Sequence, residues 1–326
     1  MPFTNTTSLI VRQLKLCVPS NDKRCLIIVF FRSESNGTNA TLPDEYRISL
    51  VVLYVLVFIG GIIGVIMMST TLMSNMRSIT RVSVINLLVV HVIFLLTVPF
   101  RVYYYASTNW ELSFIFCKLV SSMLHVHMYL SFIFYAIILC TRYLAYFQWR
   151  HRLEFYRDLH AVIASVTIWV IILAIVLPST VIIYGSGTAR NNNQCFAFGI
   201  ALNNTNVKVL NYIICVVVLL IWLVLASCQC YILWCVCRKH GKLSLAHQEF
   251  WAQIKSLCFV LIMLICFVPY QAFRIYYVCT YWQGFEKVNE VFLAVTAFSC
   301  FDMLLFSGSS VWRPSYNKMY KMCCSS

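Results

Sequence analysis

The stretch ISLVVLYVLVFIGGIIGVIMMSTTLMSNM, residues 48–76, lies between Arg47 and Arg77 and contains 29 consecutive uncharged residues. A helix that crosses the hydrocarbon core of a bilayer needs about 20 mainly apolar residues. The stretch is therefore long enough to span a membrane, and it predicts a transmembrane helix.

Six further stretches show the same absence of charge. Five of them contain 19, 23, 31, 29 and 18 uncharged residues, and the sixth contains 22 residues with Asp302 as its single charge. They are 82–100, 119–141, 159–189, 209–237, 256–273 and 291–312. We predict an all-α membrane protein, a seven-transmembrane helix bundle with a short amphipathic C-terminal helix. The expected parts are an extracellular glycosylated tail (1–46), the bundle (47–312) and a cytoplasmic tail (313–326).

The composition excludes a soluble enzyme. Of the 326 residues, 61% are hydrophobic and 11% are charged, whereas soluble domains contain about 25% charged residues. No Ser/His/Asp, metal-ligating or paired-carboxylate set converges at any depth, so we expect no catalysis, no cofactor and no metal. The net charge of +14 indicates basic inner loops that face anionic membrane lipids, and we expect no nucleic-acid partner.

Glycosylation sequons indicate the orientation in the membrane. All four fall in the tail or in the connection between the fourth and fifth predicted helices, and glycosylation occurs on the outer side. The acceptor residues are Asn5, Asn36, Asn39 and Asn203. Lys and Arg concentrate in the loops that this orientation places inside. We therefore expect a multi-pass plasma-membrane protein with an extracellular N-terminus.

The 16 cysteines can be grouped by their predicted position relative to the membrane. We interpret those within the helices, including Cys228 to Cys237, as small buried apolar residues, because helical neighbours two apart point about 200° apart and cannot share a metal. The outer cysteines are Cys17, Cys25, Cys117, Cys195 and Cys279. Their odd number leaves the pairing open. Cys323 and Cys324 follow a basic amphipathic segment and are candidate palmitoylation sites.

Ionisable residues inside membrane helices are costly and usually mark function. Arg101, Arg274 and Glu290 fall near outer helix ends, and two arginines on separate helices suggest an anion-binding mouth. The alternative is that these arginines, like Lys118, only reach toward lipid headgroups. The candidate ligand site comprises Arg101, His125, Tyr129, Gln271, Arg274 and Glu290. His125 and His127 cannot both face the bundle interior, so one of them is interpreted as a structural interface residue.

Several motifs, in order and at matching spacing over residues 47–322, resemble those of the rhodopsin-type (class A) G-protein-coupled receptors. Trp110 lies seven residues before Cys117, and Arg142 lies 25 residues after Cys117. The matching segments are Thr141-Arg142-Tyr143, Trp169, Cys266-Phe267-Val268-Pro269-Tyr270 and Asp302-Met303-Leu304-Leu305-Phe306. Leu96-Thr97-Val98-Pro99-Phe100 is similar to the purinergic-like branch. The resemblance implies a Cys117–Cys195 disulfide. In the purinergic-like branch a second disulfide joins a tail cysteine to the top of helix seven, and here Cys279 is the candidate for the helix-seven position.

The sequence also departs from the family pattern. Gly64 replaces the first-helix asparagine, His91 replaces the second-helix aspartate, and Phe267 replaces a tryptophan. Without the aspartate we expect no sodium site, and we hypothesise that His91 and Asp302 titrate as a coupled pair. Thr141 replaces the acid that restrains the arginine in the family. Because Thr141 offers only a neutral hydrogen bond, we expect raised basal signalling.

The resemblance implies a receptor that binds an unknown extracellular ligand, an anionic small molecule or lipid. It would transmit the resulting signal to a heterotrimeric G protein. The residues assigned to coupling and switching are Thr141, Arg142, Tyr143, Phe267, Pro269, Asp302 and His91. Two alternatives stay open. The first is a scavenger or partner receptor of the same fold, which ligand uptake without G-protein activation would identify. The second is a transporter, which internal repeats and paired broken helices would favour.

Overall fold

A computed structural model describes residues 11–16, 26–31, 44–74, 81–147, 157–178, 195, 205–240, 248–279 and 285–304. The chain divides into two compact units, Met1–Thr41 and Leu42–Ser326. The predicted C-terminal helix, the cytoplasmic tail, the four sequon asparagines and Cys323 and Cys324 lie outside the described residues.

The first unit contains a two-stranded antiparallel sheet. Strand β1 (Val11–Leu16) pairs with β2 (Leu26–Phe31), in a register that sets Val11 opposite Phe31 and Leu16 opposite Leu26. The run of β-branched and aromatic residues in β2 is typical of a strand. This hairpin was not predicted from the sequence.

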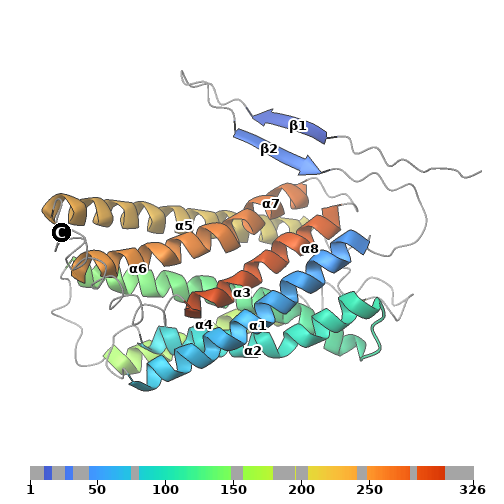
Figure 1. Cartoon of the computed structure of the whole chain (residues 1–326), viewed down its shortest axis with the longest axis horizontal. Helices are drawn as coiled ribbons and strands as arrows, with labels where there is room; N and C mark the ends of the chain where they lie inside the picture. The colour runs from blue at the N-terminus through green and yellow to red at the C-terminus, as the bar shows by residue number, and fades with distance from the viewer. Residues whose placement is uncertain are drawn as a thin grey trace, which may run out of the picture. The chain divides into compact units, whose positions relative to one another are not determined.

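The second unit is the predicted bundle of seven helical segments, as far as the structure describes the chain. Figure 1 shows these segments packed along one another. The first five are α1 (Asp44–Ser74), α2 (Arg81–Ser107), α3 (Phe114–Tyr146), α4 (Arg157–Pro178) and α5 (Thr205–His240). The sixth joins α6 (Gln248–Ile262), the π-helical turn η5 (Met263–Phe267) and α7 (Val268–Cys279). The seventh joins α8 (Phe285–Val295) to the 3₁₀ turn η6 (Thr296–Phe301) and ends in a short helical stretch at 302–304.

Helix α3 occupies the centre of the bundle. It contacts α2, α4, α5, α6, η5 and η6, and 61% of its apolar span is buried, against 17% for α5. A central helix meets neighbours on every side, so its polar residues can reach partners on several elements.

The sides of the bundle that face away from its core are apolar, as a lipid-facing surface must be. On α1 a stripe of exposed aliphatic side chains recurs every three or four residues, which is one face of a helix. The stripe comprises Ile48, Val52, Leu56, Ile59, Ile63 and Ile66. Five of the helices are long and apolar enough to cross a membrane, and α4 contains a shorter apolar stretch, Val162–Val176.

Candidate functional site

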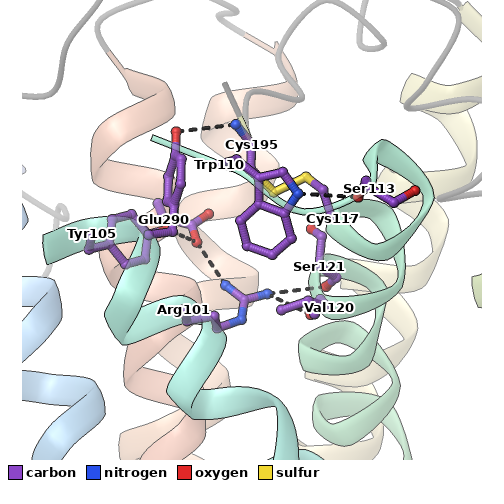
Figure 2. The surroundings of a disulfide bond; sticks show 10 residues. Arg101, Tyr105, Trp110, Ser113, Cys117, Val120, Ser121, Cys195 and Glu290 are labelled. Carbon is purple, nitrogen blue, oxygen red and sulfur yellow. Dashed lines mark hydrogen bonds and ion pairs between the residues drawn. A yellow bond between two sulfur atoms is a disulfide. The ribbon is translucent and has the colours of Figure 1, made fainter. Parts of the chain in front are cut away.

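Arg101, near the end of α2 that is predicted to be extracellular (the outer end), is 1% exposed and contacts residues of neighbouring helices (Figure 2). It forms an ion pair with Glu290 of α8 at 3.2 Å. It also donates to the backbone oxygens of Val120 and Ser121 on α3, at 3.1 and 3.3 Å. Tyr105 donates to the same Glu290 oxygen at 2.7 Å. The sequence-predicted residues Arg101 and Glu290 therefore form a hydrogen-bonded ion pair between a buried guanidinium and a partly buried carboxylate.

Arg274 on α7 lies in a second polar group at the outer end. It donates to the side-chain oxygen of Asn289 on α8 at 3.1 Å and to that of Asn211 on α5 at 3.2 Å. Its guanidinium also lies over the ring of Tyr277, 5.4 Å from the centroid. Both of these oxygens belong to amide side chains, and Arg274 therefore joins α7 to α5 and α8.

His125 lies between the two arginine groups. It is half-buried, its Nδ1 lies 3.3 Å from the Ser121 carbonyl, and it is within electrostatic range of both Arg274 and Arg101. Gln271 is buried and reaches the Met128 sulfur at 3.8 Å. Tyr129 is half-buried and packs against the apolar core.

The arginines do not extend toward headgroups, because they are only 1% and 5% exposed. The alternative of simple snorkelling is therefore wrong for Arg101 and Arg274. Lys118 differs, since its ammonium lies over the ring of Phe114 at 4.5 Å, and that ring is 51% exposed. Lys118 thus lies on the outer surface of the bundle.

A disulfide joins Cys117, at the start of α3, to Cys195, with the Cα atoms 5.9 Å apart (Figure 2). The backbone N–H of Cys195 donates to the Tyr104 hydroxyl at 3.2 Å. Trp110 donates to the Ser113 carbonyl at 3.2 Å. The pairing implied by the family resemblance is thus present beside the Arg101 group. Cys279 is exposed with a free thiol, and its suggested partners, Cys17 and Cys25, lie outside the described residues.

Apart from the two arginine groups, a third polar group surrounds His91 in the bundle interior. His91 on α2 and Asp302 approach to 3.3 Å, and the Tyr135 hydroxyl donates to the other Asp302 oxygen at 2.7 Å. The two residues suggested as a pair are therefore neighbours. Sequence reasoning missed two further members. His127 on α3 and Cys300 on η6 lie within 3.5 Å of His91 or of each other.

Helix six changes its hydrogen-bonding pattern just before Pro269. The N–H of Val268 donates to the Met263 carbonyl, five residues earlier, which is π-helical. Proline lacks an N–H and its ring crowds the carbonyl four residues earlier, so the ladder must adjust there. Phe267 is fully buried and lies edge-on to Phe132, with ring centroids 6.0 Å apart.

At the inner end, Arg142 of α3 contacts helix α6. It donates to the Ser256 hydroxyl at 3.0 Å and lies over the Phe259 ring at 5.3 Å. Thr141 donates to the Ile138 carbonyl of its own helix at 2.9 Å, and raised basal signalling stays a prediction. Tyr143 donates to the Leu225 carbonyl of α5 at 3.0 Å. Helix α3 is thus hydrogen-bonded to both α5 and α6 at this end.

The interpretation of helical cysteines as buried is correct for only some of them. Cys215, Cys266 and Cys300 are buried, whereas Cys140, Cys228, Cys230 and Cys237 are exposed on the bundle surface. For Cys228, Cys230 and Cys237 the physical reason is that α5 packs with one narrow side and presents the rest outward. A weakly polar thiol is compatible with a lipid-facing position.

Comparison with known proteins gives one matching family model, "7 transmembrane receptor (rhodopsin family)", over residues 61–309. The chain is 47% identical to human "Probable G-protein coupled receptor 141", over 81% of this chain and 89% of the relative. It is 25% identical to "Probable G-protein coupled receptor 34" of Pan troglodytes, over 85% and 76%. It is 26% identical to the "N-arachidonyl glycine receptor" of Rattus norvegicus, over 89% and 86%.

Proposed function

Because the chain belongs to the rhodopsin family of G-protein-coupled receptors, which carry an extracellular signal to heterotrimeric G proteins across the plasma membrane, we propose that its ligand is an anionic lipid or small acid that binds at Arg274. The observation that carries this proposal is the environment of Arg274: a buried guanidinium that donates to amide oxygens of two other helices.

The two arginines have different roles in this proposal. The charge of Arg101 is compensated by Glu290 at 3.2 Å, so Arg101 serves mainly to join helices. Arg274 donates to Asn211 and Asn289, and a carboxylate or phosphate accepts more strongly from a guanidinium than a neutral amide does. A ligand anion can therefore replace an amide oxygen at Arg274.

Two further features support an anion with an apolar body. His125 lies within range of both positive charges and offers an additional polar contact. The apolar core continues directly below, through Tyr129 and its neighbours. The name of the rat relative specifies N-arachidonyl glycine, a molecule with a carboxylate and a long acyl chain, which is the class of ligand proposed here.

The signal would travel from this outer site to the inner end of the bundle. Asn211, Arg274 and Asn289 lie on α5, α7 and α8, so a ligand at Arg274 acts on three helices at once. A ligand shifts the receptor between two helix arrangements only by binding one of them more tightly. With an extracellular N-terminus, Arg142 and Tyr143 face the cytoplasm, where they meet the G protein.

The test is a G-protein dissociation assay in transfected cells with a panel of acyl amino acids, fatty acids and lysophospholipids. Each carboxylic acid is paired with its methyl ester, which removes the charge and keeps the chain. We expect an acid to activate the wild type and its ester to fail. Arg274→Gln should abolish this response, whereas Lys118→Gln, which changes a surface cation, should retain it.

Three results would contradict the proposal. They are equal responses to acid and ester, an unchanged response in Arg274→Gln, and the absence of any response to the acids at verified surface expression. Cellular uptake of the acids without G-protein activation would instead support a scavenger of the same fold.

A further inference from the structure

Three side chains from three different helices meet in the interior of the bundle. They are His91 on α2, His127 on α3 and Cys300 on η6, and they are 0%, 1% and 0% exposed. Their ligand-capable atoms, His91 Nδ1, His127 Nε2 and Cys300 Sγ, all lie within 4.8 Å of one another. Two imidazoles and a thiol thus converge on one point in an apolar surrounding.

This donor set selects a particular class of metal ion. Imidazole nitrogen and cysteine sulfur are the usual protein ligands of Zn²⁺. Na⁺ and Mg²⁺ are hard cations that prefer oxygen, so a site of two nitrogens and a sulfur does not suit them. The chemistry therefore favours a thiophilic transition-metal ion.

The distances fit three of the four positions of a tetrahedral site with one adjustment. With bonds of about 2.0 Å to nitrogen and about 2.3 Å to sulfur, tetrahedral ligands place sulfur and nitrogen about 3.5 Å apart. Cys300 Sγ lies 3.4 Å from His91 Nδ1 and 3.5 Å from His127 Nε2. The two nitrogens are 2.8 Å apart, a hydrogen-bond distance. Binding would separate the rings by about 0.5 Å.

Neighbouring residues already orient the first histidine. His91 directs Nδ1 into the cluster, and its Nε2 lies 3.3 Å from Asp302. Asp302 is itself held by the Tyr135 hydroxyl at 2.7 Å. A carboxylate behind a ligating histidine is the usual supporting arrangement at metal sites, because it fixes the tautomer and the ring. His127 is held by its stacking on Phe94, with centroids 4.2 Å apart.

Charge balance identifies the ion more closely. A buried ion is tolerated only when its charge is compensated. A divalent cation, the Cys300 thiolate and the Asp302 carboxylate sum to zero, whereas a monovalent copper ion would leave a net negative charge in the core. We propose that His91, His127 and Cys300 form a buried Zn²⁺ site, in which Asp302 positions His91.

The ion would join α2, α3 and η6. The thiol proton of Cys300 is released on binding, and both imidazoles ligate in their neutral form. Bound metal therefore stabilises the packed arrangement of these three elements. This site is separate from Arg274 and does not depend on the identity of the extracellular ligand.

The test uses the full chain, purified in detergent and stripped of metal with a chelator. Zn²⁺ at a hundredfold excess over its Kd should raise the midpoint of thermal unfolding by about 5 °C, and Na⁺ or Mg²⁺ should not. Co²⁺, a spectroscopic substitute for Zn²⁺, should bind with one thiolate-to-metal charge-transfer band that Zn²⁺ abolishes by competition.

Variants separate this site from the other thiols. Cys300→Ser should lose the cobalt band, and His91→Asn and His127→Asn should each lose the zinc-dependent shift. Cys215→Ser, which removes a buried cysteine on α5, and His125→Asn, two residues from His127, are matched controls and should keep both signals.

A measurement on the wild type alone protects the test against variants that fail to fold. X-ray absorption at the zinc edge should show one sulfur and two imidazoles around the ion. The proposal is overturned by the absence of a zinc-dependent shift, by a cobalt band that persists in folded Cys300→Ser, or by a zinc shell with several sulfurs, which would indicate surface cysteines.

Discussion

Arg101 is the largest of the fully buried side chains in the part of the chain that the structure describes. A lone buried guanidinium would be very costly. It is retained because Glu290 supplies the opposite charge and Tyr54, Val120 and Ser121 accept hydrogen bonds. The outer end of the bundle is therefore held by one charged group with contacts on α1, α2, α3 and α8.

Removing the carboxylate from this group should destabilise the fold. Breaking a buried pair costs about 3–5 kcal/mol. Because Glu290 is 13% exposed, we expect Glu290→Ala to fall at the lower end of that range. Glu290→Gln keeps an acceptor for Tyr105 and should lose less. The thermal unfolding midpoint of the purified receptor measures the effect. If Glu290→Ala is as stable as Glu111→Ala, which changes an exposed residue, the pair is not structural.

At the same scale, sequence alone identified the charged residues and missed their neutral partners. Arg101, Arg274 and Glu290 are conspicuous because a charge in an apolar stretch is rare. Asn211, Asn289 and Ser256 carry no such signal, since amides and hydroxyls occur widely in helices. The convergence of His127 and Cys300 on His91 depends on how three helices are rotated, which no local pattern encodes.

The helices were predictable because charge gaps measure the length of chain that can lie in lipid. Their ends were less so: α6 begins at Gln248, seven residues before Lys255, because a helix continues into water beyond the hydrocarbon core. The hairpin in the tail was missed because its strands of six residues are much shorter than the uncharged stretches that identify membrane helices. Pro269 was assigned from the sequence to coupling and switching, and the π-turn lies directly before it.

Close packing of α1 against the seventh segment gives an element-scale prediction. A Cβ atom on Gly64 would lie 3.1 Å from the Met303 Cβ, an atom near the backbone that cannot rotate away. Gly64→Ala should therefore cost about 1–3 kcal/mol through overpacking, seen as a lower unfolding midpoint and reduced surface expression. Ile63→Ala, on the exposed face of the same helix, is the control. A Gly64→Ala variant as stable as that control would contradict the packing.

Across the bundle, the inner halves of α3 and α5 are joined to α6 by hydrogen bonds in which the partner on α6 is neutral. Arg142 is bound to Ser256 of α6, and Gln229 of α5 donates to Gln253 of α6 at 3.0 Å. A neutral partner restrains the arginine less than a carboxylate would. The expected basal signalling thus has a structural basis in Ser256 rather than in Thr141.

Loss of the Ser256 hydroxyl should shift the receptor toward its signalling arrangement. A hydrogen bond that involves a charged group is worth about 1.5–3 kcal/mol, or about a tenfold to hundredfold change in the equilibrium between the two arrangements. Ser256→Ala should therefore raise ligand-independent G-protein dissociation. Ser227→Ala, which removes a hydroxyl bound only within α5, should not. Equal basal signals in the two variants would show that the Arg142–Ser256 contact does not restrain the bundle.

The most direct test of receptor function removes the arginine itself. Basal G-protein dissociation would be measured in cells expressing the wild type, Ser256→Ala, Arg142→Ala and the double variant at matched surface levels. We expect a signal in the wild type, a larger one in Ser256→Ala, and none above mock-transfected cells in either variant that lacks Arg142. A signal that survives Arg142→Ala, or no signal in the wild type and Ser256→Ala despite good surface expression, would contradict the account.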